Sequence, residues 1–173
     1  MTRQISVTAI IIRADNRDFR VVNNADLIAD IRYGTADFAM PGSDLTNENP
    51  NWAGLDAEEV DKLRDCEFVF ATDKNMGLDL NRAVRVATSY EKTTIEGIDV
   101  IGREIGLMGL ENYRVIKRAG KVEGSVPGLA DAIVDVRQTG KSLERNNLVE
   151  RVSLGHIMLC GLWRMDTASM AVI

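Results

Sequence analysis

Residues 82–150 alternate strand-like and helix-like segments, and this alternation restricts the fold more than any other feature of the sequence. "VRVAT" (84–88) is rich in β-branched residues and predicts a buried strand. "EKTTIEGIDVIGREIG" (91–106) places apolar residues at helical spacing. "YRVIKRAG" and "GLADAIVDV" predict two more strands, with a short helix between them. Strands joined by helical crossovers predict an α/β sheet.

The flanking residues predict a second group of strands. Apolar runs indicate strands at residues 5–13, 19–22, 36–42, 66–72 and 153–163, and a short amphipathic helix at 24–34. Residues 43–54 are polar and predict a loop. Residues 56–64 predict a helix, because Asp56 can cap its start and Glu59 completes a capping box.

We therefore expect two lobes, because the last strand can return to the first group of strands. The first lobe is expected at residues 1–83 with 151–173, and the second at 84–150. The chain has 173 residues, of which 45% are hydrophobic, and that length can bury a core without disulfides.

Charge and cysteine content exclude several classes of protein. The net charge of −5 argues against a general nucleic-acid binder, which needs a basic face. The first residues, "MTRQISVTAIIIR", are too short and too polar for a signal peptide or a membrane span. Cys66 and Cys160 are expected to be buried thiols, and with a single histidine they are too few for a structural zinc site. We expect a cytoplasmic protein that binds neither nucleic acid nor membranes.

A small, hydroxyl-rich turn, "QTGKSL" (138–143), follows the last strand of the second lobe. A phosphate at the start of a helix is bound by free backbone N–H groups and by the helix dipole. Gly140 would let the backbone approach closely, and Lys141 would add positive charge. Thr139 and Ser142 would add hydroxyl donors, although the same residues also fit an ordinary strand-to-helix turn with hydroxyl caps.

Two aspartates precede this turn. Asp131 and Asp135 are four residues apart in a strand pattern, so alternation places them on the same face. A carboxylate just before a phosphate turn is suited to bind sugar hydroxyls, or a magnesium ion through water. Asp131 equally fits a surface residue at the start of the strand.

Nucleophilic catalysis has no clear candidate in this sequence. His156 lies in an apolar run with no acid or nucleophile beside it in the sequence, which favours a core or surface histidine. No serine or cysteine has the context of an activated nucleophile.

The segments "RVATSY" (85–90), "GLADAIVDV" (128–136) and "TGKSLERNNLVE" (139–150) resemble the ATP phosphoribosyltransferase family of histidine biosynthesis. The resemblance is specific from Arg85 to Glu150 and extends over most of the chain.

Two further segments carry the resemblance. "ADLIADIRYGTADFAMPGSDL" (25–45) is similar to a first-lobe segment of the family, with these residues at the matching places: Gly34, Asp37, Gly42 and Asp44. "AGKVEGSVPGLAD" (119–131) is similar to the family's Gly-Ser-Val-Glu segment. Here Glu123 is kept, Lys121 replaces the serine, and one residue fewer precedes Gly128.

The resemblance implies an α/β, two-lobed, periplasmic-binding-protein-like fold with mixed sheets and a cleft between the lobes. It implies an enzyme that transfers phosphoribosyl from phosphoribosyl pyrophosphate to N1 of ATP, with magnesium accompanying the pyrophosphate. The residues that would bind the 5-phosphate are Thr139, Gly140, Lys141, Ser142 and Leu143. Asp135, and with it Asp131, would face the ribose. The other candidates for the cleft are Glu123, Gly42, Asp44, Thr88, Ser89 and Tyr90.

That reaction fits a sequence without a catalytic dyad. Adenine N1 already carries a lone pair, so it needs no strong base. The sugar carbon develops positive charge while pyrophosphate leaves with magnesium. Orientation and electrostatic stabilisation can carry such a reaction.

The sequence also departs from the family. Family members open with a strand that ends in Lys-Gly-Arg, followed by a helix, and end with a closing helix; this sequence has neither end segment, nor the histidine-sensing domain of the long form.

One hypothesis is a minimal phosphoribosyltransferase whose missing charge comes from Arg13, Arg20 or a neighbouring subunit. Another is a non-catalytic binder, a sensor or sequestering protein for a nucleotide or phosphoribosyl ligand. A fragment that binds nothing is the third.

Partner expectations follow from the same comparison. Apolar sheet edges left without the two end segments favour a homo-oligomer. The short form of the family works with a regulatory subunit that resembles a histidyl-tRNA synthetase, and such a subunit is a second candidate partner.

Overall fold

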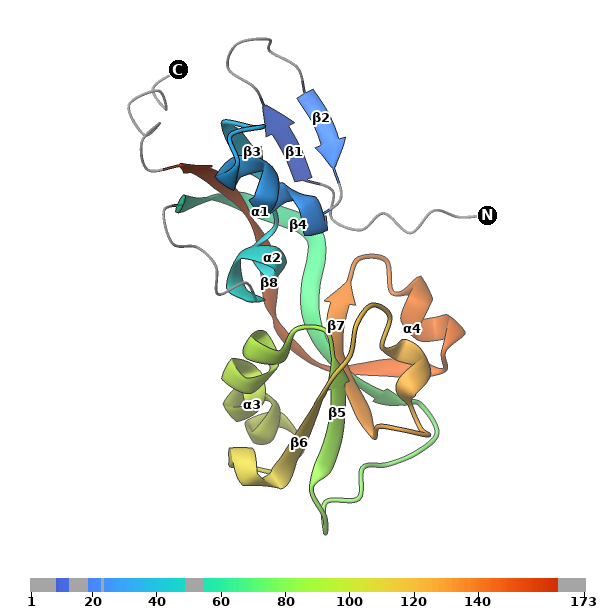
Figure 1. Cartoon of the computed structure of the whole chain (residues 1–173). Coiled ribbons are helices and arrows are strands. Elements are labelled where there is room, and N and C mark those ends of the chain that lie inside the picture. Colours follow the sequence, from blue (N-terminus) through green and yellow to red (C-terminus); the bar gives the residue numbers. More distant parts are fainter. Residues whose placement is uncertain (1–8, 13–18, 23, 49–54, 165–173) are drawn as a thin grey trace. The chain divides into compact units, whose positions relative to one another are not determined.

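The computed structural model describes residues 9–12, 19–22, 24–48 and 55–164. The chain divides into two compact units. Unit 1 comprises Met1–Leu63 and Met158–Ile173, and unit 2 comprises Arg64–Ile157. Two long strands, β4 (Leu55–Asp73) and β8 (Leu148–Arg164), each contribute to both units (Figure 1).

Unit 1 is built on antiparallel strands. Its other elements are β1 (Ala9–Ile12), β2 (Phe19–Val22), α1 (Asn24–Arg32), β3 (Phe38–Met40) and α2 (Ser43–Glu48). Strand β1 pairs with β2 and β3, and β3 pairs with the end of β8. The core of the unit consists of fully or nearly buried apolar residues: Leu27, Ile31, Ala36, Ala39, Leu55 and Leu162.

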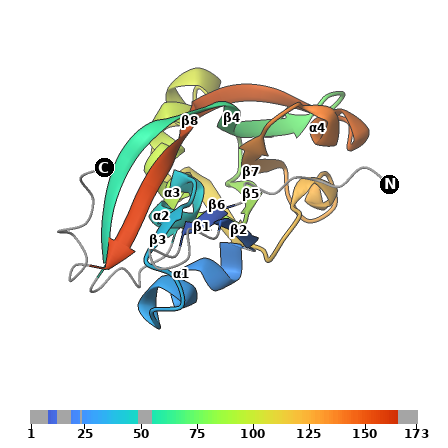
Figure 2. The same ribbon diagram turned by 90° about the horizontal axis from the view of Figure 1, so that it is seen from above.

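Unit 2 is a mixed α/β sheet. Its elements are β5 (Val84–Thr88), α3 (Glu91–Ile105), η1 (Leu110–Asn112), β6 (Tyr113–Lys117), η2 (Glu123–Ser125), β7 (Ala132–Arg137) and α4 (Lys141–Arg145). The strand order is β8-β4-β7-β5-β6. Strand β5 runs parallel to β6 and β7, while β4 is antiparallel to β7. Strands β4 and β8 lie side by side (Figure 2).

Alternate residues of the unit 2 strands enter two apolar clusters. Phe70, Val86 and Val134 pack with buried residues of α3, such as Ile98 and Ile101. Their neighbours along the strands, Val69, Ala87 and Ile133, form the second cluster. This cluster also contains Val122, which directly precedes η2, and Leu143 of α4. Because side chains alternate along a strand, the two clusters lie on opposite faces of the sheet.

Most of the expected elements are present, but two expectations for residues 43–64 are wrong. A helix, α2, occupies part of the expected polar loop. The expected helix at 56–64 is the first half of strand β4. The acidic, lysine-containing stretch has good local helix propensity, but pairing with the long strand β8 overrides it.

The unit boundaries also differ from the expected ones. They fall after Leu63 and Ile157, instead of after Ala83 and Glu150. The second half of β4 pairs with β7 and therefore belongs to unit 2. Among the described residues, no helix is both long and apolar enough to cross a membrane.

Candidate phosphate and ribose site

The turn between β7 and α4 contains a glycine in a left-handed backbone conformation. Gly140 has φ 73°, a left-handed conformation that favours glycine, and it directly precedes α4. The first N–H groups of a helix have no partner within the helix. Thr139 and Lys141 are exposed, whereas Leu143 is buried in the core and anchors α4. The turn can therefore present backbone N–H groups to an anion.

Glu123 and Ser142 meet beside this turn. Glu123, in η2, is only 4% exposed. The hydroxyl of Ser142 donates a hydrogen bond to Glu123 Oε1. Because the Ser142 hydroxyl donates its hydrogen to Glu123, the group of Ser142 that can donate to a phosphate is its backbone N–H.

Asp135 lies on the face of the sheet against which α4 packs. It pairs with Val69 and shares the strand face of Ile133, which packs against the η2 and α4 side. Burial raises the pKa of Asp135 to about 7, and the charge of Glu123 acts in the same direction. The N–H of Val136, which donates to Asp135 Oδ1 at 2.8 Å, opposes this shift. Near neutral pH, Asp135 can therefore either donate or accept a hydrogen bond.

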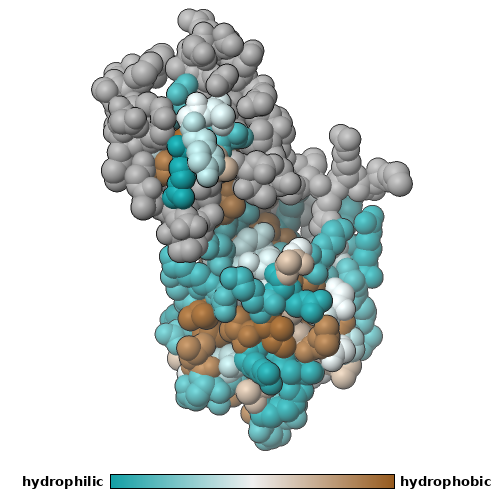
Figure 3. All heavy atoms as spheres, in the orientation of Figure 1, coloured by the Kyte–Doolittle hydropathy of each residue, from teal (hydrophilic) through white to brown (hydrophobic). Residues whose placement is uncertain are grey.

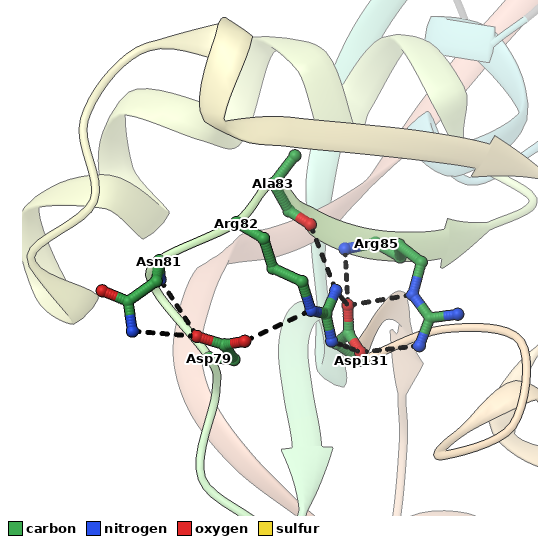
Figure 4. A network of polar contacts seen from close by, with 6 residues as sticks. All are labelled: Asp79, Asn81, Arg82, Ala83, Arg85 and Asp131. Carbon is green, nitrogen blue, oxygen red and sulfur yellow. Dashed lines mark hydrogen bonds and ion pairs between the residues drawn. The ribbon is translucent and has the colours of Figure 1, made fainter.

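Asp131 has a different environment (Figure 4). It precedes β7, so it lies at the strand end opposite to the turn. Both carboxylate oxygens accept hydrogen bonds from Arg82 and Arg85, at 2.8–3.1 Å. The Arg82 hydrogen bond, followed by those of Arg85, holds the pKa of Asp131 far below its usual range. Asp131 ties β5 to β7, and we leave it out of the proposed site.

Thr88, Ser89 and Tyr90 lie at or just after the carboxyl end of β5. Because β5 and β7 are parallel, this end and the turn after β7 share one edge of the sheet. Thr88 Oγ1 accepts a hydrogen bond from the N–H of Tyr90, and the Tyr90 ring contacts Phe68 edge to face. Ligands of open α/β sheets bind at such carboxyl ends.

Gly42 and Asp44 belong to unit 1. Gly42 forms a bridge to Leu159 of β8. Asp44 is only 5% exposed, and burial raises its pKa against the opposing backbone hydrogen bond to Leu45. Their role as ligand residues stays a prediction. Arg13 lies outside the described residues, and the side chain of Arg20 is not described.

A network around Arg137 was not expected from the sequence. Arg137 Nη2 donates to Glu67 Oε2 at 2.7 Å, and Arg137 Nε lies 2.8 Å from Glu150 Oε2. Ser153 donates to Glu67 at 3.0 Å, and His156 Nδ1 lies 3.3 Å from Glu67 Oε1. These residues come from three strands, so only the strand register, which the sequence does not reveal, brings them together.

A hollow of about 240 Å³ in unit 2 is lined by Thr72, Met76, Gly77, Leu78, Leu80, Ile105 and Arg151. It lies beside the end of β4, which is antiparallel to β7, and therefore away from the turn. Cys66 and Cys160 are buried free thiols, as expected. Within the described part of the chain, no three His, Cys, Asp or Glu residues are grouped to hold a metal ion.

Comparison with solved structures defines the class of fold. The periplasmic aliphatic sulphonate binding protein SsuA of Escherichia coli matches 84% of this chain and 50% of its own, with a TM-score of 0.63 at 14% identity. An ATP phosphoribosyl transferase (HisG:HisZ) complex from Thermotoga maritima matches 86% of this chain and 69% of its own, with a TM-score of 0.62 at 23% identity. The expected periplasmic-binding-protein-like α/β fold is confirmed.

The sequence model of the HisG family, ATP phosphoribosyltransferase, matches residues 23–160, and the chain belongs to this family. The ATP phosphoribosyltransferase of Staphylococcus carnosus is 33% identical over 147 residues, which are 84% of this chain and 65% of that protein. That of Cupriavidus taiwanensis is 36% identical over 137 residues, 75% of this chain and 56% of that protein. The chain thus spans a little over half to about two thirds of the length of these relatives.

Proposed function

We propose that this protein binds a phosphoribosyl ligand at the turn after β7 and transfers the phosphoribosyl group from phosphoribosyl pyrophosphate to N1 of ATP. The observation that carries the proposal is the left-handed Gly140 at the start of α4, with Asp135 and Glu123 on the adjoining sheet face. Family membership supports the choice of ligand and reaction.

The 5-phosphate would lie against the turn. Backbone N–H groups of residues 140–142 would donate to its oxygens, and Lys141 would add positive charge at close range. The buried Leu143 fixes the helix behind these groups, so little conformational entropy is lost when the anion binds.

The acids beside the turn suit the hydroxyls of a ribose. Asp135 can accept a hydrogen bond from one hydroxyl, and its raised pKa also lets it donate one near pH 7. Glu123 accepts the Ser142 hydrogen bond with Oε1, so its second carboxylate oxygen could accept a hydrogen bond from a ribose hydroxyl. Negative charge near the ribose would also stabilise positive charge that develops on the sugar carbon as the pyrophosphate, which carries its own magnesium, departs.

A non-catalytic binder is the second candidate. Its support is that the turn, Asp135 and Glu123 all belong to unit 2, so this unit by itself contains the groups to which we assign the phosphoribosyl moiety. Such a protein would sense or sequester the ligand without turnover.

We also propose a homo-oligomer. Unit 2 exposes large apolar side chains: Ile95, Val100, Met108, Leu110 and Leu129. On the face drawn in Figure 3, apolar residues of this unit gather in a band. Exposed apolar side chains that gather in a patch are typical of protein interfaces. The similar structure from Thermotoga maritima is a HisG:HisZ complex, which supports a second type of subunit as a further candidate partner.

Mass spectrometry separates the two functions. The purified protein is incubated with ATP, phosphoribosyl pyrophosphate and magnesium, and the mixture is searched for phosphoribosyl-ATP. Accumulation supports the transferase, whereas intact substrates together with saturable binding of ribose 5-phosphate support the binder. Absence of both would refute the proposed function.

A further inference from the structure

Arg137 stands immediately before the proposed phosphate turn. It is the last residue of β7 and pairs with Glu67 of β4, while Asp135 pairs with Val69. Because side chains alternate along a strand, Arg137 and Asp135 lie on the same face. A cation therefore adjoins the groups to which we assign the phosphoribosyl ligand.

The cation is held between two carboxylates. Its Nη2 donates to Glu67 Oε2 at 2.7 Å, and its Nε forms an ion pair with Glu150 Oε2 at 2.8 Å. Strand β4 lies between β7 and β8 in the sheet. The contacts of Arg137 therefore connect the end of β7 to both β4 and β8. The exposed fractions of the three side chains are 28%, 19% and 33%, so solvent screens these contacts less than it screens surface pairs.

Glu67 is itself fixed by β8. Its oxygens also face the Ser153 hydroxyl, at 3.0 Å, and His156 Nδ1, at 3.3 Å. The Ser153 hydrogen bond first, and then Arg137, lower the pKa of Glu67. Glu67 therefore stays an anion at neutral pH and keeps the guanidinium in one orientation.

We infer that Arg137 is a positioning residue for the phosphate turn: its bridge between Glu67 and Glu150 holds the end of β7 so that residues 138–142 keep an anion-binding geometry. On the far side of the turn, the buried Leu143 and the Ser142–Glu123 hydrogen bond do the same for α4. The turn is thus held at both ends before any ligand arrives. The inference rests on the proposed function.

Positioning can be distinguished from a simple effect of charge. If Arg137 acted only as a positive charge, Glu150→Gln would leave it less neutralised and strengthen phosphate binding. If Arg137 acts by bridging, Glu150→Gln releases one side of the bridge and weakens binding. Lysine keeps the charge but cannot contact two carboxylates with a planar fork, so Arg137→Lys separates the two effects as well.

The experiment measures the affinity for ribose 5-phosphate by titration calorimetry at a temperature where melting curves show every variant folded. Arg137→Met, Arg137→Lys and Glu150→Gln are compared with the wild type. The matched control is Arg103→Met, which removes an exposed arginine whose Nε bonds to Asp99 O in its own helix. Hydrogen exchange of the amides of residues 138–142 is followed without ligand.

We expect Arg137→Met to bind about tenfold more weakly, Arg137→Lys to recover little of this loss, and Arg103→Met to match the wild type. Glu150→Gln is expected to weaken binding. Without ligand, the amides of residues 138–142 are expected to exchange faster in the two Arg137 variants and in Glu150→Gln, and at the wild-type rate in Arg103→Met. General destabilisation would not change the affinity of folded protein. Wild-type affinity in Arg137→Met, or stronger binding by Glu150→Gln, would overturn this inference alone; a wild type that does not bind would overturn the proposed function with it.

Discussion

Arg85 holds both carboxylate oxygens of Asp131, with Nε 3.1 Å from Oδ2 and Nη2 2.8 Å from Oδ1. Their backbones are also joined, since the N–H of Asp131 donates to the carbonyl of Arg85. Arg82 adds two more hydrogen bonds from outside the sheet. An aspartate that the sequence suggested for ribose binding thus fastens β7 to β5 at the edge away from the turn.

Asp131→Asn is therefore expected to destabilise the protein by about 1.5–3 kcal/mol, because charge-assisted hydrogen bonds of partly buried groups are lost. Urea denaturation at pH 7 measures the change. The ribose 5-phosphate affinity of the folded variant should equal that of the wild type. A large loss of affinity would return Asp131 to the ligand site.

The pH dependence of this contribution follows from the lowered pKa of Asp131. The unfolded carboxyl titrates near pH 4, so the stabilisation is present above about pH 4 and is lost as the pH falls toward the folded value. The stability difference between wild type and Asp131→Asn should therefore shrink below about pH 4. A difference that stays constant down to pH 2 would contradict the assignment.

Asp135→Asn is expected to stabilise the protein at high pH, whereas Asp131→Asn destabilises it. The pKa of Asp135 is raised to about 7, so the folded state favours the protonated carboxyl. The stability that this preference contributes is lost as the pH rises from about 4 through 7. The asparagine mimics the neutral acid and should raise the free energy of unfolding at pH 8, by on the order of 1 kcal/mol or more. Ribose 5-phosphate binding should weaken, since an acceptor of hydroxyl hydrogen bonds is lost.

Chemical denaturation at pH 5 and pH 8 tests the predicted change in stability, because Asp135→Asn should raise the free energy of unfolding only slightly at pH 5. Equal effects at both pH values would show that Asp135 does not titrate in this range.

Gly140→Asp is expected to abolish binding of ribose 5-phosphate while the fold persists, because it places a carboxylate at the turn. Gly106→Asp is the matched control: Gly106 has φ 76°, Gly140 has φ 73°, and no heavy atom would lie within 4 Å of a Cβ at either position. Both variants carry the same backbone strain and the same charge. Calorimetry compares the affinities of the two variants for ribose 5-phosphate, and a difference between them can come only from the position of the new carboxylate. Equal affinities would show that the turn is not part of the ligand site.

Leu143→Ala is expected to destabilise the protein by about 2–5 kcal/mol, since Leu143 is buried in a cluster with Ile133 of β7 and with the two valines that flank η2. Leu129→Ala, at a residue that is 56% exposed, should have a small effect and serves as the control. Urea denaturation measures both. Similar small losses would mean that α4 is not anchored through Leu143.

Local patterns were sufficient for much of the fold. The β-branched run at 84–88 and the helical spacing at 91–105 correspond to β5 and α3. The run of small, hydroxyl and glycine residues after β7 marked the turn, because Gly140 adopts a conformation that glycine favours. Residues 56–64 could not be assigned locally, because the strand there depends on pairing with a segment about a hundred positions away.

Spacing or identity within short segments was enough to predict the α/β class, the family and the position of the turn before α4. The tertiary structure decided which charges meet. It paired Asp131 with Arg82 and Arg85, left Asp135 partly buried beside Glu123, and brought Arg137 between Glu67 and Glu150. The physical reason is strand register: it sets which distant side chains face one another, and a pKa or an ion pair depends on those neighbours.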